Sequence, residues 1–306
     1  MTEYLIGTGG WGYFKVPSKP SLRAYSEHFN FVEVNYTFYE YPDSRTVERW
    51  RQTVPDDFTF TVRCHQDLTH KIGLQSTDEA IEVFGRMIWI CKILDAPFLH
   101  LLTPANYSLD NRKIRQARDL FSTANWKGVQ LAWEVRSTIT PKLGDLMRDM
   151  EIVNSVDLSR EKFPQKTDII YTRLFGKGRH NIYQFIDEEL MEIDQRILKA
   201  EAKTAFITYH GVRMNSDASR FKHYKETGRF LPVSAFTGID SIRSALEEDA
   251  KFPCTKTELV KHQGWKVVDL TIDKRVHLSK MLSKLHEKTY GNIQEVIKEL
   301  EVSTLE

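Results

Sequence analysis

The stretch Phe31-Val32-Glu33-Val34-Asn35-Tyr36-Thr37-Phe38 is one of eight short apolar runs that decide the fold. Each run has the length and composition of a β-strand, and helix-length segments separate most of them. A chain that alternates strand and helix eight times closes into a parallel barrel with its helices outside. We therefore predict an α/β fold, a parallel (β/α)8 TIM-type barrel. The other runs are Tyr4–Trp11, Phe58–His65, Pro97–Pro104, Val129–Arg136, Ile152–Ser159, Asp168–Gly176 and Ala205–Gly211.

Beyond residue 238 the apolar residues follow a helical spacing, as in Ile293–Leu300. Thr255 and Glu258 have the spacing of a capping box, which predicts a helix that begins at Lys256. We therefore predict two domains, a barrel over residues 1–238 and a small basic helical module over residues 239–306.

The composition is that of an ordinary globular protein. Of the 306 residues, 41% are hydrophobic and 28% are charged, and the formal net charge of +1 selects no polyanionic partner. No run approaches the roughly 20 apolar residues of a membrane span, and Met1–Tyr4 do not open a secretory signal. The cysteines Cys64, Cys91 and Cys254 lack metal-type spacing and are expected to be reduced thiols. We expect a cytoplasmic protein without a membrane partner.

Two segments are locally basic. Lys251–Thr289 carries nine Lys and Arg residues against four Asp and Glu residues, and Arg213–Phe230 interleaves basic with aromatic residues. Such segments suit a nucleic-acid backbone. The alternative is a solvated lysine-rich helix face. We favour the solvated face for these segments taken alone, whereas nucleic acid is the partner that we predict for the chain as a whole.

Alternation along each strand separates the side chains that face the helices from those that face the barrel axis. In the run Phe31–Phe38, Val32 and Val34 take the outward positions and leave Glu33 and Asn35 inside. The same reasoning places the following polar residues inside: Thr8, Thr37, Thr61, Arg63, His65, His100, Glu134, Arg136, Ser155, Asp157, Tyr171, Arg173, Thr208 and His210.

Seven ionic groups from six strands would then meet at the carboxyl ends of the strands, where barrel enzymes hold their active sites. They form either a lattice of structural ion pairs or a site for a charged substrate, because buried charges must be paired or liganded. A barrel built for stability alone would place Val, Ile or Leu there, so we favour a site. The seven groups are Glu33, Arg63, Glu134, Arg136, Asp157, Arg173 and His210.

Arginines match phosphate or carboxylate oxygens with two hydrogen bonds. The carboxylates and histidines would serve as general acid and base or would hold Mg²⁺, Mn²⁺ or Zn²⁺, although no local metal motif favours the second role. The predicted catalytic residues are Glu33, Glu134, Asp157, His70 and His210. The predicted substrate-binding residues are Thr8, Trp11, Tyr13, Asn35, Arg63, His65, Arg136, Tyr171 and Arg173.

Three of these residues lie in loops rather than in strands. Trp11 and Tyr13 belong to the glycine-rich segment Gly7–Tyr13, where they would either stack on a base or sugar or simply pack. His70 follows the third run, a good position for a catalytic histidine and equally for a histidine that caps its loop.

The chain resembles the YecE-like family of barrels, known as domain of unknown function 72, over about residues 4–230. The resemblance implies a TIM-type barrel related in shape to endonuclease-IV-like and sugar-isomerase barrels, and it implies no particular reaction. The chain departs from the family at His100–Pro104, at Arg63 and at Tyr209–Gly211. The module after residue 238 faintly resembles another small domain of unknown function. The resemblance rests on Gly7–Tyr13, Phe31–Tyr39 with Pro42 and Trp50, Phe58–Arg63, Thr69-His70, Glu134-x-Arg136 and Tyr171-x-Arg173.

Three functions fit these observations. The first is a nucleic-acid phosphodiesterase or repair nuclease, with arginines on the phosphates and carboxylates or histidines that activate water. The second is an enzyme that acts on a phosphorylated sugar or similar anion, with Glu134 or Glu33 as the base. The third is a barrel that binds nucleic acid or protein without catalysis. We predict the hydrolase.

Overall fold

The computed structural model describes residues 2–126, 128–161 and 166–304. The chain divides into two compact units, the first made of residues 1–173 and 197–209 and the second of residues 174–196 and 210–306. The predicted domain boundary at residue 238 lies within the second unit, and it stays a prediction.

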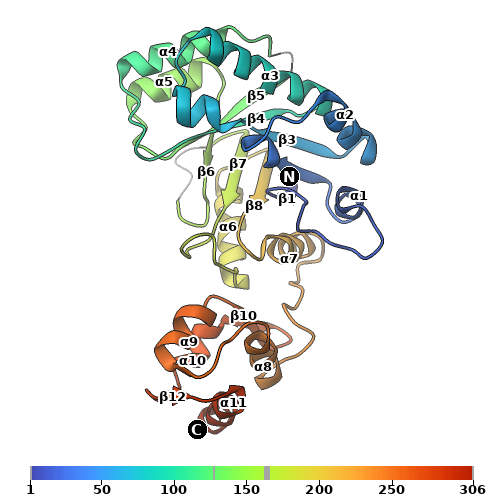
Figure 1. Ribbon diagram of the computed structural model, residues 1–306, viewed down its shortest axis with the longest axis vertical. Coiled ribbons are helices and arrows are strands. Elements are labelled where there is room, and N and C mark those ends of the chain that lie inside the picture. The colour runs from blue at the N-terminus through green and yellow to red at the C-terminus, as the bar shows by residue number, and fades with distance from the viewer. Residues whose placement is uncertain (1, 127, 162–165, 305–306) are drawn as a thin grey trace. The chain divides into compact units, whose positions relative to one another are not determined.

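Eight parallel strands, hydrogen-bonded to one another in chain order, form a closed barrel (Figure 1). The barrel closes where β1 pairs with β8, Thr8 standing opposite Tyr209. Each of the eight predicted runs overlaps one strand, so the predicted fold class is confirmed. The strands are β1 (Glu3–Thr8), β2 (Phe31–Val34), β3 (Thr59–Arg63), β4 (Phe98–Thr103), β5 (Gln130–Val135), β6 (Val153–Val156), β7 (Ile169–Leu174) and β8 (Thr204–Tyr209).

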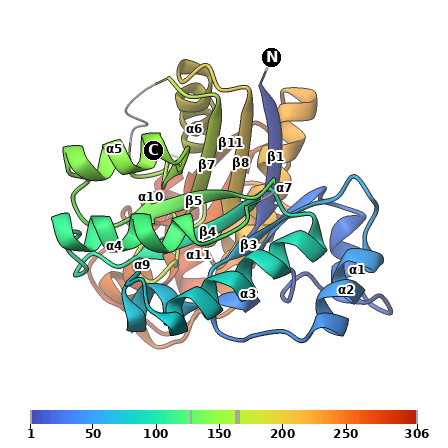
Figure 2. The same cartoon turned by 90° about the horizontal axis from the view of Figure 1, so that it is seen from above.

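Helices follow most strands of the first unit, and Figure 2 shows α3, α4 and α5 along the outside of the sheet. Their beginnings are set by the local sequence, since side-chain oxygens of Thr77, Asp110 and Thr140 accept hydrogen bonds from backbone N–H groups of the first turns. The helical elements are α1 (Ser21–Ser26), the 3₁₀ turn η1 (Tyr36–Phe38), α2 (Ser44–Thr53), the π-helical turn η2 (Asp67–Ile72), α3 (Asp78–Leu94), α4 (Asn111–Ser122) and α5 (Pro141–Asp149).

An aromatic layer fills the lower part of the barrel. The ring of Phe206 lies 5.6 Å from Phe31 and 5.0 Å from Phe98, and Phe98 lies 5.7 Å from Tyr171. Leu5 and Ala132 complete the layer. Each buried ring contributes about 1.5–3 kcal/mol of transfer free energy, so this layer is a stabilising part of the apolar core. Glu33, Glu134 and Arg173 each follow a residue of this layer by two positions, so they share its face and lie nearer to the carboxyl ends of the strands.

The second unit contains its own apolar core, built largely from residues beyond Gly238. The predicted capping box is confirmed, because the Thr255 N–H donates to Glu258 at 2.8 Å and the Glu258 N–H donates to the Thr255 hydroxyl at 3.2 Å. The expectation of a helical module is incomplete, since two short antiparallel pairs join the helices. The second unit contains α7 (Met214–Thr227), α8 (Ile239–Glu247), β9 (Cys254–Thr255), α9 (Lys256–Gln263), β10 (Val267–Thr271), β11 (Lys274–His277), α10 (Leu278–Leu282), β12 (Thr289–Tyr290) and α11 (Ile293–Thr304), together with most of α6 (Asp187–Lys199).

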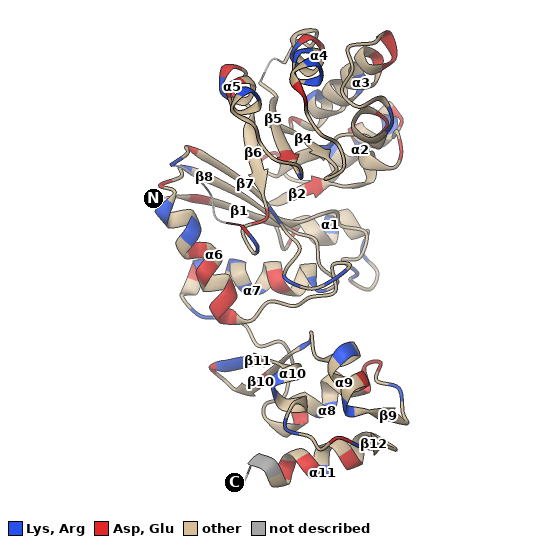
Figure 3. Ribbon diagram, turned by 90° about the vertical axis from the view of Figure 1, so that its left-hand side faces the viewer, with Lys and Arg blue, Asp and Glu red and all other residues tan. Residues whose placement is uncertain are grey.

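Several cations of the predicted basic segments are used inside the second unit. Lys266 is buried and donates to Asp249 and to the Ala245 carbonyl, each at 2.6 Å. Arg275 is also buried, and it pairs with Asp187 at 2.7 Å. Figure 3 shows acidic and basic residues interspersed rather than separated. These segments therefore present less positive charge to solvent than their composition indicates.

Within the described part of the chain, no helix combines the length and the apolar character that a bilayer crossing requires.

Candidate active site at the carboxyl ends of the strands

An arginine bridged to two glutamates forms the centre of the site. Glu33 in β2 is fully buried, and Arg173 in β7 is 1% exposed. The Arg173 guanidinium donates from Nε to Glu33 at 3.2 Å and from Nη1 to Glu134 in β5 at 2.8 Å. One cation shared by two carboxylates meets the requirement that buried charges be paired. The three side chains therefore form a fixed unit.

Glu134 also orients a second arginine at the surface. Arg136 follows β5 directly, and its Nε donates to Glu134 at 2.7 Å. The Arg136 side chain is 45% exposed, whereas that of Glu134 is 13% exposed. Burial raises the pKa of Glu134, but Arg173 and Arg136 together bring it below its usual value. Glu134 is therefore an ionised anchor at neutral pH.

A layer of polar side chains supports Glu33 from below. The Tyr171 hydroxyl donates to Glu33 at 2.9 Å and lies 2.8 Å from the Thr61 hydroxyl. The His100 ring stacks on Tyr171 with 5.2 Å between centroids, and its Nε2 lies 3.3 Å from the Ser155 hydroxyl. Burial raises the pKa of Tyr171 well above its usual value, so the phenol stays protonated and keeps donating.

Arg63 ends β3 and lies beside the central ion pairs. Its Nη1 donates to the Asn35 side-chain oxygen at 2.6 Å, and its guanidinium lies 3.6 Å from the centre of the Phe38 ring. Among the described residues, Arg63 Nε is buried without a hydrogen-bond partner. Burial and the charge of Arg173 lower the pKa of Arg63 to about 10, so it remains a cation at neutral pH.

His70 lies close enough to Arg63 and Arg136 for their positive charges to act on its ring. It belongs to η2, its Nδ1 is 2.8 Å from the Thr69 hydroxyl, and its ring meets the Phe38 ring edge-on at 5.3 Å. Partial burial and the charges of Arg63 and Arg136 lower the pKa of His70 below its usual 6.5. We call Arg63, His70 and Arg136 the arginine–histidine edge. It combines two cations with a histidine that is neutral at pH 7.

Three other predicted residues make different contacts. Asp157 lies one residue beyond β6 and accepts from the Ser159 N–H at 2.9 Å, so it shapes its own loop. His65 is buried, and its ring stacks on Tyr41 at 3.8 Å. His210 belongs to the second unit, where its ring stacks on Phe175 at 4.9 Å.

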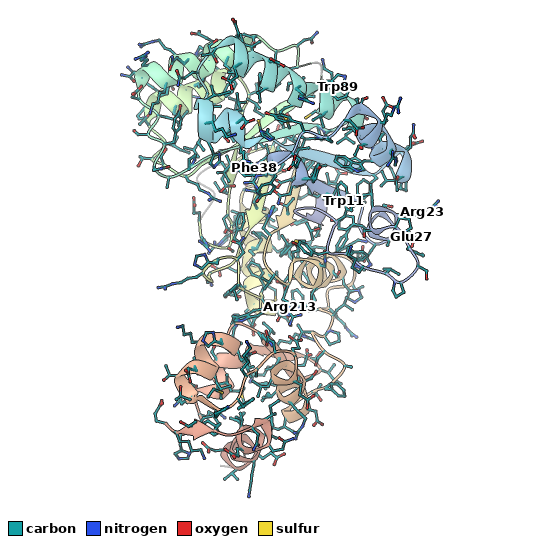
Figure 4. All side chains as sticks on the ribbon, viewed as in Figure 1. Trp11, Arg23, Glu27, Phe38, Trp89 and Arg213 are labelled. Atoms are coloured by element: carbon teal, nitrogen blue, oxygen red, sulfur yellow. The ribbon has the colours of Figure 1, made fainter. Side chains whose placement is uncertain are left out.

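The side chains at the end of β1 and in the loop after it mainly make packing contacts. The Thr8 hydroxyl is buried and donates to the Gly10 carbonyl at 2.8 Å. Trp11, which Figure 4 labels, lies in this loop. Its ring packs edge-on against that of Trp50, with 5.2 Å between the ring centres. Tyr13, by contrast, is 84% exposed. The contacts of Trp11 favour the packing interpretation, and binding roles for Trp11 and Tyr13 stay predictions.

The donor set does not fit a divalent metal. No group of three His, Cys, Asp or Glu side chains within the described ranges is arranged to hold one. Glu33 and Glu134, the two carboxylates that converge, share Arg173, whose guanidinium holds the position a cation would need. We therefore assign to these residues no step that depends on Mg²⁺, Mn²⁺ or Zn²⁺.

Two features of the site were missed by the strand pattern. Residues Tyr36–Phe38 form the 3₁₀ turn η1 instead of continuing β2, which leaves Tyr36 51% exposed and Tyr39 57% exposed. The local pattern gives no sign of this turn, because Tyr36, Thr37 and Phe38 continue the alternation of the strand. The π-helical turn that carries His70, a form often found at functional sites, also has no signal in the sequence.

Comparisons with known proteins agree with the fold. Residues 5–227 match the model of a family described as "Protein of unknown function DUF72". The chain is 34% identical over 102 residues to UPF0759 protein YunF of Bacillus subtilis and 38% identical over 64 residues to UPF0759 protein YecE of Escherichia coli. These matches cover 31% and 21% of this chain, and they span only 35% and 24% of the two relatives.

Two solved structures have the same architecture. A DUF72 family protein of Thermotoga maritima superposes with a TM-score of 0.60 at 22% identity, covering 73% of this chain and 99% of its own. A DUF72 family protein of Enterococcus faecalis gives a TM-score of 0.57 at 15% identity, covering 74% of this chain and 98% of its own. At these identities the likeness concerns the fold alone.

Proposed function

The chain belongs to the DUF72 family, a family of unknown function, and we propose that its barrel is a hydrolase that acts on phosphodiester bonds of nucleic acid. The observation that carries the proposal is the arginine–histidine edge, in which Arg63 and His70 both contact the Phe38 ring. Partial burial and the charges of Arg63 and Arg136 lower the pKa of His70 there. Two guanidinium groups can neutralise a phosphodiester. A neutral histidine beside them can act as a general base.

In the proposed reaction, Arg63 and Arg136 bind the phosphate oxygens. The neutral His70 accepts a proton from a water molecule as the water oxygen forms a bond to phosphorus. The ester P–O bond breaks, and the departing oxygen takes a proton from solvent. The arginines stabilise the negative charge that develops on the phosphate oxygens.

Glu33, Glu134, Tyr171 and Arg173 are positioning residues in this proposal. The carboxylate of Glu134 orients Arg136, and Arg173 holds Glu134 in turn. Glu33 accepts from Tyr171 and Arg173 and so completes the rigid support. Such support matters because a catalytic group displaced by about 1 Å can lose a hundredfold in rate.

Exposed aromatic side chains near the edge favour nucleic acid over a small phosphate ester. Tyr36 and Tyr39 follow Asn35, the hydrogen-bond partner of Arg63, and both are more than half exposed. Bases stack on exposed rings, whereas a small anion does not need them. The proposed location is the cytoplasm, in keeping with free cysteines at positions 64, 91 and 254.

Cleavage of labelled oligonucleotides by the purified full chain tests the proposal. Single-stranded, duplex and abasic substrates are incubated in the presence of a chelator, and we expect cleavage to persist because the donor set does not fit a metal. His70→Asn should lower kcat at least about a hundredfold with binding retained, the usual loss for a general base. His262→Asn, the same change at an exposed histidine of α9, should leave the rate unchanged.

Three results would overturn the proposal. The absence of cleavage of all three substrates refutes nucleic-acid hydrolysis. Turnover of a phosphorylated sugar in its place supports the small-molecule enzyme. Salt-dependent binding of oligonucleotides without cleavage supports a non-catalytic barrel.

A further inference from the structure

The 3₁₀ turn η1 and the residue after it expose two tyrosines on one side of the backbone. Tyr36 is 51% exposed and Tyr39 is 57% exposed. A 3₁₀ helix has three residues per turn and rises about 2 Å per residue, so residues three apart lie above one another, about 6 Å apart. The backbone bond from Tyr39 N–H to the Tyr36 carbonyl, at 3.0 Å, closes this turn.

The turn is fixed by its other two residues. The Thr37 hydroxyl lies 2.8 Å from the Val34 carbonyl and 2.6 Å from the Arg63 carbonyl, so it ties the turn to both β2 and β3. Phe38 is buried under the guanidinium of Arg63. The exposure of Tyr36 and Tyr39 is therefore a property of a rigid segment. Each ring leaves about half of its surface in water, and that half contributes no burial to folding stability.

The same turn is connected to the arginine–histidine edge. Asn35 precedes it and accepts from Arg63, while the Phe38 ring contacts both Arg63 and His70. Tyr39 meets Phe38 edge-on at 4.9 Å, and Tyr36 meets Trp50 at 5.9 Å. The turn that carries the two tyrosines is therefore a neighbour of any nucleotide whose phosphate binds at the edge.

We propose that Tyr36 and Tyr39 form a base-stacking shelf, and that the nucleic acid bound at the arginine–histidine edge is single-stranded or has unpaired bases there. This inference rests on the proposed function, since it specifies the substrate of the same site. A paired base has both faces covered by its neighbours in the duplex. Only an unpaired base can offer a free face to a tyrosine ring.

The test compares two labelled oligonucleotides with equal numbers of phosphates, a thymidine dodecamer and a dodecamer of abasic residues. Affinities are measured by fluorescence anisotropy in the His70→Asn background, so that cleavage does not consume the probe. We expect the thymidine strand to bind at least tenfold more tightly than the abasic strand.

Each of Tyr36→Ala and Tyr39→Ala should reduce that preference about tenfold and leave the affinity for the abasic strand unchanged. The corresponding Phe variants should keep the preference, because stacking requires the ring and not the hydroxyl. Trp89→Ala is the matched control, since Trp89 is 40% exposed on α3 (Figure 4).

Equal binding of the two strands would overturn the shelf, as would Ala variants that weaken both strands alike. Absence of binding to either strand would also overturn it. These outcomes are distinct from failure of the proposed function, in which the protein shows the preference for bases but the unmodified chain cleaves no oligonucleotide.

Discussion

Replacement of Arg173 by methionine tests the energetic role of the central ion pairs. The variant removes the cation that Glu33 and Glu134 share and leaves Glu33, which is fully buried, with a charge that Arg173 no longer balances. Breaking a buried pair in this way typically costs about 3–5 kcal/mol. Glu134 keeps Arg136 as a partner, so most of the loss should come from Glu33.

The assay is the free energy of unfolding by urea, followed by circular dichroism at neutral pH. The double variant Glu33→Gln/Arg173→Met should recover at least half of the loss, because a neutral amide can remain buried beside Tyr171. Arg118→Met is the control, since it breaks an exposed pair with Asp149 and should cost about 1 kcal/mol or less. A loss below about 1 kcal/mol for Arg173→Met, or no recovery in the double variant, would refute the reasoning.

Three further predictions concern other parts of the chain. Thr255→Ala should lower the stability of the second unit by about 1 kcal/mol in thermal unfolding, because it removes the capping box of α9. Burial raises the pKa of Glu189, but His277, Tyr183 and Lys177 bring it to about 2. The ionised carboxylate therefore stabilises the fold fully above its usual pKa of 4.5, and this contribution is lost as the pH falls toward 2. Glu189→Gln should therefore flatten the pH dependence of unfolding over that window, which corresponds to at most about 3 kcal/mol. Trp11→Ala should destabilise the chain by about 2 kcal/mol without changing oligonucleotide affinity, and a loss of affinity alone would contradict its packing role.

The barrel was predictable because its signal is local. Each strand is a short apolar run between turn or helix segments, and each predicted run overlaps a strand. The exception within these runs is Tyr36–Phe38, where the strand pattern continues but the chain forms a 3₁₀ turn. The Thr37 hydroxyl binds the carbonyl of Arg63, 26 residues away. A contact at that distance leaves no trace in the local pattern.

The site was predictable to the extent that alternation decides which face a side chain takes. Alternation placed Glu33, Glu134 and Arg173 inside, and their contacts bring them together. Alternation does not predict which way a side chain points once the strand has ended. Asp157 is such a case, because a residue one position past β6 is free to turn back and bind Ser159.

The second unit shows the limit of composition as a guide. The segment Val267–His277 forms a hairpin, although its turn lacks the Asn-Gly or Asp-Gly pair that usually marks one. The basic composition of Lys251–Thr289 favoured a solvated surface, yet Lys266 and Arg275 are buried in ion pairs. Whether such a basic side chain is buried depends on acidic partners from other segments of the chain.

The pKa of His70, measured by NMR on histidine-labelled protein with His70→Asn for assignment, tests most directly whether two cations and a neutral histidine form an anion site. We predict a value below 6.5 in the free protein, because partial burial and the charges of Arg63 and Arg136 disfavour the imidazolium. Inorganic phosphate should raise this pKa, and Arg63→Met should weaken that response. A value at or above 6.5 that phosphate does not change would contradict the account.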